Sequence, residues 1–229
     1  MEICEFYHSR QGEGLLTGTP SIFLRTSGCN LRCGFCDTPF ASWEPEGQKA
    51  SIAELAERIL SDPTSHVVIT GGEPMVWKSL QALTEMLVHG GKHVTIETAG
   101  TIDRPVACNL MSISPKLSNS DPDPLRAGRW LARHRKRRQD ALEVVPRLMS
   151  RYPYQLKFVV ATLEDLEEAT QFLRLLGPLD ADRVLWMPEG IDPKVLDERT
   201  GWLEPWCRKH GFRFCPRKHI EWYGNRRGT

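Results

Sequence analysis

Three cysteines within eight residues constrain this chain more than any other feature of its sequence. Cys29, Cys33 and Cys36 have the spacing C-x3-C-x2-C and directly follow the apolar run 21–25. Three thiolates on one short loop can hold three corners of a cubane iron–sulfur cluster, and the loop has no fourth Cys or His to complete the coordination. One iron would stay open for another ligand. Structural zinc is the alternative, but it usually takes four ligands in two separate pairs, and this chain offers no second pair.

The overall composition is that of an ordinary single-domain enzyme. The 229 residues are 40% hydrophobic and 26% charged, and no Pro/Ser-rich linker divides them, so we expect one domain over 1–229. The net charge of +1 favours neither nucleic acid nor membrane as a partner. Residues 1–5 lack the basic region of a signal peptide, and no apolar stretch is long enough to span a bilayer. Because the seven cysteines are odd in number and show no disulfide framework, we expect a reducing, cytoplasmic location.

Apolar runs and helical patterns alternate along the chain. We expect strands at 21–25, 66–70, 94–98, 110–114, 155–160 and 184–187, and helices at 51–60, 80–88, 141–150, 162–176 and 193–210. This alternation predicts an α/β fold with parallel strands and outer helices. A complete eight-stranded barrel needs about 250 residues. With six or seven strands, an incomplete (partial) TIM-type barrel fits better.

Glycines and small polar residues follow nearly every expected strand. They lie in the cysteine loop and at 70–74, 98–101, 114–116 and 188–190. In barrel-type α/β folds, the carboxyl ends of the strands form the active-site rim, and glycine lets a ligand approach the backbone closely. The sequence therefore predicts a site built at this rim.

These motifs together resemble a known group of enzymes. The cysteine triplet and the turn Gly71-Gly72-Glu73-Pro74 are similar to the radical S-adenosylmethionine (SAM) superfamily. The ordered segments 11–14, 27–31, 36–39, 97–100 and 114–116 resemble, more narrowly, the 7-carboxy-7-deazaguanine synthase family. The similarity spans nearly the whole chain.

The resemblance implies a reaction and a set of cofactors. A 4Fe-4S cluster would bind SAM through its open iron and cleave it to a 5'-deoxyadenosyl radical. The radical would act on 6-carboxy-5,6,7,8-tetrahydropterin, which contracts its ring, loses ammonia and yields 7-carboxy-7-deazaguanine for 7-cyano-7-deazaguanine and queuosine biosynthesis. The enzyme would be a carbon–nitrogen lyase that regenerates SAM and also uses Mg2+.

The resemblance also implies roles for individual residues. The implied cluster ligands are Cys29, Cys33 and Cys36, and the implied magnesium ligand is Thr38. The implied substrate-binding residues are Gln11, Gly12, Glu13, Arg25, Thr70 and Thr229. The implied SAM-binding residues are Phe35, Cys36, Asp37, Gly72, Ser114, Lys116, Gln155 and Lys157. The segment 216–229 would fold over the substrate.

Each role has a simpler structural alternative. Arg25 suits a bidentate pair with the pterin carboxylate, but it also suits an internal salt bridge. Residues 11–14 could form only a turn, Lys157 could point outward, and the last residues could be a frayed terminus.

One segment has no counterpart in the family pattern. Residues 121–151 look longer than the usual connection and resemble a basic insert. Between 126 and 139 the segment has seven cations and no acidic residue: Arg126, Arg129, Arg133, Arg135, Lys136, Arg137 and Arg138. Such a run is usually a solvated helix face. It could also contact a second subunit, since the family suggests a homodimer, or an acidic electron donor such as flavodoxin.

Two other functions remain open at this point. A radical SAM activase for a glycyl-radical enzyme shares the cysteine spacing, although 11–14 and 36–38 argue against it. A non-catalytic module could hold zinc in its thiols and bind RNA with its basic run. Otherwise we expect a small-molecule pterin substrate, no membrane contact and no direct nucleic-acid partner.

Overall fold

One open, mostly parallel β-sheet organises the chain. The computed structural model describes residues 1–229, and its sheet has the strand order β3-β1-β2-β4-β5-β6-β7-β8-β9. The strands are β1 (Glu2–Arg10), β2 (Pro20–Thr26), β3 (Gln48–Lys49), β4 (His66–Gly71), β5 (His93–Thr98), β6 (Leu110–Ile113), β7 (Tyr154–Val160), β8 (Val184–Pro188) and β9 (Arg213–Phe214). From β2 to β9 all neighbouring strands pair in parallel, whereas β1 pairs antiparallel with both β2 and β3.

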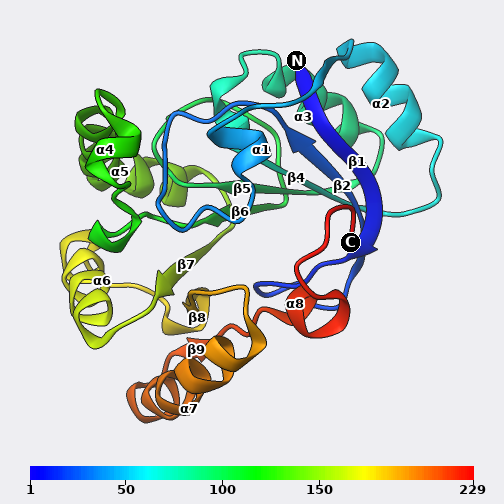
Figure 1. Cartoon of the computed structure of the whole chain (residues 1–229). Coiled ribbons are helices and arrows are strands. Elements are labelled where there is room, and N and C mark those ends of the chain that lie inside the picture. The colour runs from blue at the N-terminus through cyan, green and yellow to red at the C-terminus, as the bar shows by residue number, and fades with distance from the viewer.

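Helices connect most of the parallel strands and cover the outer face of the sheet (Figure 1). They are α1 (Pro39–Ser42), α2 (Ile52–Leu60), α3 (Leu80–His89), α4 (Pro124–Ala127), α5 (Trp130–Arg151), α6 (Leu163–Leu176), α7 (Pro193–His210) and α8 (Lys218–Tyr223). Capping boxes begin two of the helices, since Ser51 caps α2 through Glu54 and Thr162 caps α6 through Asp165. None of the helices is long and apolar enough to cross a membrane.

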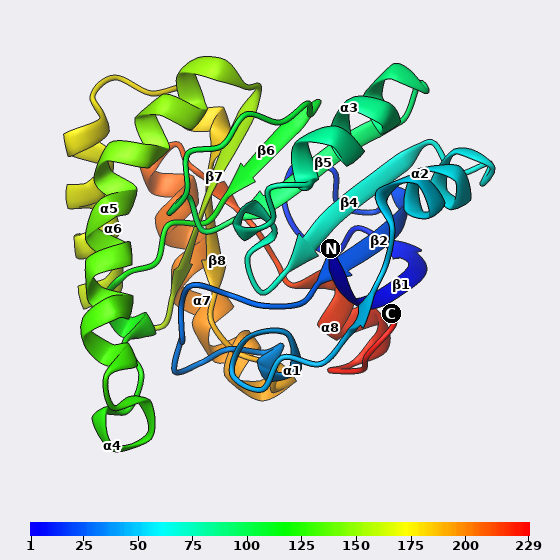
Figure 2. The same ribbon diagram turned by 90° about the horizontal axis from the view of Figure 1, so that it is seen from above.

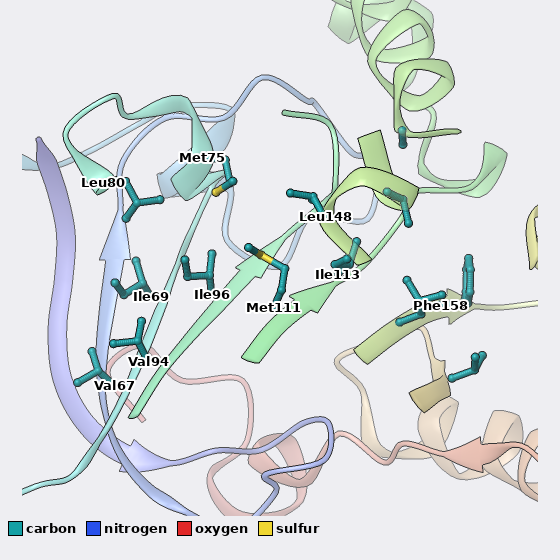
Figure 3. Close-up of a cluster of buried hydrophobic side chains, with 14 of the residues drawn as sticks. Val67, Ile69, Met75, Leu80, Val94, Ile96, Met111, Ile113, Leu148 and Phe158 are labelled. Carbon is teal, nitrogen blue, oxygen red and sulfur yellow. The ribbon is translucent and has the colours of Figure 1, made fainter. Parts of the chain in front are cut away.

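Successive residues of each strand face opposite sides of the sheet. Ile22 and Leu24 of β2 lie in the main hydrophobic core, whereas Phe23 and Arg25 line a cavity on the concave side. The strands β4 to β7 send Val67, Ile69, Val94, Ile96, Met111, Ile113 and Phe158 into that core, where Met75, Leu80 and Leu148 also lie (Figure 3). A two-residue repeat thus separates an apolar outer layer, covered by helices, from a more polar inner layer that is free to bind ligands.

The predicted fold class is confirmed, but the predicted number of strands is too low. The sheet has nine strands and stays open, with β3 and β9 at its two edges. The long strand β1 was missed because its residues are half-buried or exposed and polar residues interrupt its apolar ones. The strands β3 and β9 have two residues each, too few to produce a pattern.

The helix before β7 is longer than predicted. It begins at Trp130, whereas the sequence predicts a start near 141, so most of the basic run lies on the first half of α5. The second half packs on the sheet through Ala141, Val145 and Leu148. The first half was not predicted because most of its residues are charged and its one fully buried side chain is His134, so it shows no apolar repeat of helical period.

The end of the chain returns to its beginning. In Figure 1, α8 and the residues after it lie beside β1 and the loop that follows β1. The Lys218 backbone N–H donates a hydrogen bond to the Gly12 carbonyl at 3.0 Å. A Cβ on Gly12 would lie 2.6 Å from the His219 Cβ, so only glycine permits this approach. Residues 217–229 therefore complete the wall of the concave side.

Candidate active site

A cavity of about 590 Å³ occupies the concave side of the sheet, towards the carboxyl ends of the strands. All of the predicted site residues except Gln155 line it. They are Gln11, Gly12, Glu13, Arg25, Cys29, Cys33, Phe35, Cys36, Asp37, Thr38, Thr70, Gly72, Ser114, Lys116, Lys157 and Thr229. The volume is that of an ordinary small-molecule pocket. The structure thus gathers residues from seven separate segments of the sequence around one space.

The cysteine loop after β2 forms one wall of the cavity and is fixed from several sides. The Arg32 guanidinium donates to the carbonyls of Cys29 at 2.9 Å and Leu31 at 2.7 Å. The Trp43 indole donates to the Cys33 carbonyl at 3.0 Å. Cys29, Cys33 and Cys36 pack together around Leu31 and Ala99. The loop backbone is therefore ordered by groups other than the three thiols.

The donor set suits a cluster better than a single metal ion. No group of three or more His, Cys, Asp or Glu side chains is placed to hold one ion. A cubane has a separate iron for each protein thiolate, so its ligands need not converge on a point. Burial raises the pKa of Cys33 to about 12, and burial together with Cys33 and Glu73 raises the pKa of Cys29. Thiolates here need cationic iron beside them, as bound metal would provide.

The Gly71-Gly72-Glu73-Pro74 turn supports the cysteine loop from behind. A Cβ on Gly72 would lie 2.4 Å from the carbonyl oxygens of Gly28 and Ala41, so no larger residue fits. Glu73 is fully buried and accepts hydrogen bonds from the Thr98 hydroxyl and the Ala99 N–H, both at 2.8 Å. It therefore ties the ends of β4 and β5 together and does not face the cavity.

A buried network of charges crosses the cavity at Glu13. Its carboxylate accepts hydrogen bonds from the Lys157 ammonium and, at 3.1 Å, from Arg217 Nε; His219 Nδ1 lies 3.7 Å away. Arg217 also donates to Asp37 and, at 2.6 Å, to the Gly190 carbonyl. Burial alone would raise the pKa of Glu13, but Lys157 and Arg217 hold it well below its usual range. Two carboxylates, Glu13 and Asp37, and two cations, Lys157 and Arg217, are therefore charged at neutral pH and compensate one another.

Arg25 makes an internal salt bridge and lines the cavity at the same time. Its Nε donates to Glu5 Oε2 at 2.7 Å and its Nη2 to the Tyr7 hydroxyl at 3.0 Å. Glu5 Oε1 in turn accepts from Arg227 Nε at 3.2 Å. The structural and the ligand-binding interpretations of Arg25 are thus compatible, because a guanidinium has five N–H donors and these contacts use two.

The remaining predicted residues are distributed as follows. Lys116 Nζ donates to Ser114 Oγ at 2.9 Å beyond β6, and Thr38 Oγ1 lies 3.9 Å from Cys36 Sγ. Thr229 Oγ1 donates to the Arg226 carbonyl, and Asn225 to Thr229 line the cavity. Gln155 lies outside the lining: its side chain accepts from Leu15 N–H at 2.8 Å and donates to Ser112 Oγ at 2.7 Å. The position of Gln155 supports the loop after β1, and a SAM contact for it stays a prediction.

Several residues of the site were not predicted. Arg217 joins Glu13 to Asp37, Glu5 joins Arg25 to Arg227, and Glu97 accepts from the Gln11 amide at 3.0 Å. Glu97 lies in the segment 97–100 that carried the resemblance, so that signal was available. Arg217 lies in the segment 216–229 that was predicted to fold over the substrate, but nothing in the sequence paired it with Glu13, 204 positions away. Glu5 gave no signal, because its partner Arg25 lies 20 positions away on another strand.

The buried His134 of α5 fastens the cysteine loop. Its Nδ1 accepts the Arg32 N–H at 3.1 Å, and its Nε2 lies 3.0 Å from Ser120 Oγ. The Gly34 N–H donates to the Ser120 carbonyl at 3.0 Å. The backbone N–H groups on both sides of Cys33 are therefore held by Ser120 and His134. Because Nδ1 accepts, the imidazole must be neutral.

We expect His134 to make stability depend on pH. Burial lowers the pKa of His134 to about 4, although Asp121 opposes the shift. The pKa of a histidine in an unfolded chain is about 6.5. The folded protein then binds fewer protons between these values, so stability falls as the pH drops from about 6.5 towards 4. The variant His134→Asn keeps an acceptor for the Arg32 N–H but does not titrate. Urea unfolding should show that the free energy of unfolding falls between neutral pH and pH 5 by about 1–2 kcal/mol less in this variant than in the wild type. Equal losses of stability in the two proteins would show that His134 does not cause the pH dependence.

Comparisons with known proteins agree with this geometry. Residues 23–176 match the Radical SAM superfamily. The 7-carboxy-7-deazaguanine synthase of Rhodopirellula baltica is 47% identical over 99% of this chain and 88% of its own. The enzyme of the same name from Halobacterium salinarum is 41% identical over 96% of this chain and 89% of its own. A crystal structure of QueE from Escherichia coli has the same fold, with a TM-score of 0.66 and 24% identity over 95% of this chain and 94% of that one.

Proposed function

This chain belongs to the 7-carboxy-7-deazaguanine synthase family of the radical SAM superfamily, and we propose that it converts 6-carboxy-5,6,7,8-tetrahydropterin to 7-carboxy-7-deazaguanine with loss of ammonia. One observation carries the proposal: the three loop thiols, the Glu13 network and Arg25 all line a single cavity. Family membership also sets aside the activase and the zinc-binding module.

The superfamily implies a 4Fe-4S cluster and SAM, which together supply a radical that abstracts hydrogen from the substrate. Cys29, Cys33 and Cys36 would hold the cluster. Beside them, Ser114 and Lys116 present a hydroxyl and an ammonium to the cavity, which suits the ribose and carboxylate of SAM. Gly72 lines the cavity and would contact SAM through its backbone, while its missing side chain lets the glycine turn pack directly against the carbonyls of Gly28 and Ala41.

The polar groups on the other side of the cavity suit a carboxylated pterin. Arg25 would bind the substrate carboxylate with the N–H groups that Glu5 and Tyr7 leave free. Glu13 is a charged acceptor for an amino-substituted ring, and a carboxylate has lone-pair sites beyond the two that Lys157 and Arg217 use. Gln11 and Thr70 add neutral hydrogen-bonding groups, and residues 225–229 would exclude water from the bound ring.

The finer assignments extend this proposal. Thr38 would contribute one oxygen to a Mg2+ ion whose other ligands are substrate and water, as is common for Mg2+. The enzyme would act as a cytoplasmic homodimer and take electrons from a reductant such as flavodoxin. The product would enter the route to 7-cyano-7-deazaguanine and queuosine.

An anaerobic assay tests the reaction and the substrate together. Reconstituted protein would be supplied with SAM, dithionite, Mg2+ and 6-carboxytetrahydropterin, and the deazaguanine product would be followed by mass. Product that depends on all four components supports the proposal. SAM cleavage without product would keep the superfamily chemistry but reject this substrate. No cleavage despite an intact cluster would overturn both.

We expect Arg25→Lys to weaken substrate binding. Lysine keeps the positive charge but cannot form the planar bidentate pair, so KM for the pterin should rise about 10-fold to 100-fold, a loss of one or two charge-assisted hydrogen bonds. The SAM concentration that gives half-maximal reductive cleavage should change less than about twofold. Steady-state kinetics in each substrate measures both. A normal KM for the pterin would leave Arg25 with only its salt bridge to Glu5.

A further inference from the structure

We propose that a basic groove between the cysteine loop and α5 is the docking surface for an acidic one-electron carrier protein. The inference rests on the proposed function, which requires a reduced cluster. The groove has a volume of about 850 Å³, and Cys29 lines both the groove and the active-site cavity. A carrier seated there would lie against a cluster ligand without entering the substrate pocket.

The groove has three distinct walls. Its floor is the loop Ser27 to Asn30, one side is Val76 and Trp77 after the glycine turn, and the other side is α5. In Figure 2 the loop after β2 extends from the sheet to α5. The His134 contact with Arg32 and the Arg32 guanidinium, 4.0 Å above the Trp130 ring, fix the loop to the helix. The floor and the α5 wall are thus one continuous surface.

The charge of the groove selects the partner. Arg133, Lys136 and Arg137 are exposed along it, and Asp140 is the one carboxylate in its lining. Asp140 pairs with Lys136 at 2.5 Å and with Arg137 at 3.3 Å, whereas Arg133 makes no ion pair and lies 5.3 Å from the Trp130 ring centroid. An acidic protein surface complements this excess of positive charge and is drawn to it at long range.

The place of the groove favours a redox protein over a nucleic acid. A nucleic acid would gain phosphate contacts along α5 but nothing from proximity to Cys29. The rate of electron transfer falls steeply with distance, so a carrier bound beside Cys29 would lie close enough to reduce the cluster. One electron leaves the reduced carrier and enters the cluster, and no proton or covalent bond is exchanged. The half-buried Trp77 and Trp130 line the groove and would provide apolar contact for a docked partner.

A paired charge reversal tests this surface. The double variant Arg133→Glu/Lys136→Glu should bind flavodoxin, used as the acidic probe, at least about 10-fold more weakly at low salt. The Kd for flavodoxin should also depend less on salt concentration than in the wild type. Titration calorimetry with the reconstituted protein gives Kd without requiring turnover. The matched control Lys194→Glu/Lys209→Glu makes the same change in net charge on α7, which contributes no residue to the groove, and should bind flavodoxin like the wild type.

Turnover separates this inference from the proposed function. With dithionite, a small reductant that needs no docking surface, the double variant should form product at the wild-type rate; with reduced flavodoxin its rate should fall about 10-fold. Equal flavodoxin affinity in the double variant and the wild type would overturn the docking surface. A double variant that loses affinity for transfer RNA but keeps its affinity for flavodoxin would overturn it as well. Failure of the wild type to form product with dithionite would instead overturn the proposed function, and the calorimetric result would still stand.

Discussion

Replacing Cys29, Cys33 or Cys36 with alanine should abolish SAM cleavage. The three thiols line one cavity, and the loop has no fourth Cys or His to replace a lost ligand. Two thiolates cannot retain a cubane with one iron already open, so each variant should lose its iron as well as its activity. Iron analysis and the amount of 5'-deoxyadenosine formed with dithionite would measure both.

The control for this experiment is another buried cysteine. Cys207 lies in α7, is 1% exposed and packs in the main hydrophobic core. Cys207→Ala removes one small buried group, which costs on the order of 1 kcal/mol of stability, and should leave the iron content and turnover unchanged. A triplet variant with wild-type turnover, or a Cys207 variant without iron, would refute the assignment of the ligands.

Glu13→Gln should lose both catalytic efficiency and stability. The substitution removes the carboxylate that compensates Lys157 and Arg217, each with a side chain only 8% exposed. Leaving buried cations without their partner destabilises a protein by about 3–5 kcal/mol. The same change removes a charged acceptor from the substrate pocket, so we expect kcat/KM to fall by a factor of about 100 or more. Denaturant unfolding and steady-state kinetics measure the two effects separately.

A second variant distinguishes the two roles of Glu13. In Glu13→Gln/Lys157→Met the uncompensated ammonium is gone, so part of the lost stability should return, whereas the lost acceptor should keep turnover low. Glu57→Gln on the exposed face of α2 is the control for the loss of a carboxylate and should change neither property. Full recovery of turnover in the double variant would show that Glu13 acts only on the fold.

The cysteine loop and the strand ends were recognisable from the sequence because they depend on local patterns. The spacing of Cys29, Cys33 and Cys36 is fixed within one loop, and the alternation of apolar runs with helical repeats requires only neighbouring residues. The core strands and the helices α2 and α6, which begin at local capping boxes, accordingly agree with the structure. The strand β1 did not show such a pattern, because its pairing with β2 and β3, rather than its apolar content, keeps it in the sheet.

The glutamate of the glycine turn illustrates a different limit. The segment 71–74 marks the turn correctly, yet Glu73 faces away from the cavity and binds the Thr98 hydroxyl and the Ala99 N–H. The sequence gives no sign of that direction, because it depends on how β4 and β5 lie side by side. Gln155 is similar. Strand alternation places it on the same side of β7 as Lys157, yet its amide binds the Leu15 N–H and the Ser112 hydroxyl and supports the loop after β1.

By itself the sequence determined the cysteine loop, the order of the core strands and of the helices between them, and the edge of the sheet where the predicted site residues gather. Each of these follows from short-range spacing or from a periodicity of two or 3.6 residues. Only the tertiary structure decided that Arg217 would meet Glu13, that Glu5 would join Arg25 to Arg227, and that the basic half of α5 would lie against the cysteine loop. Contacts of this kind form between segments as many as 222 positions apart, and they depend on how the whole chain packs rather than on any local pattern.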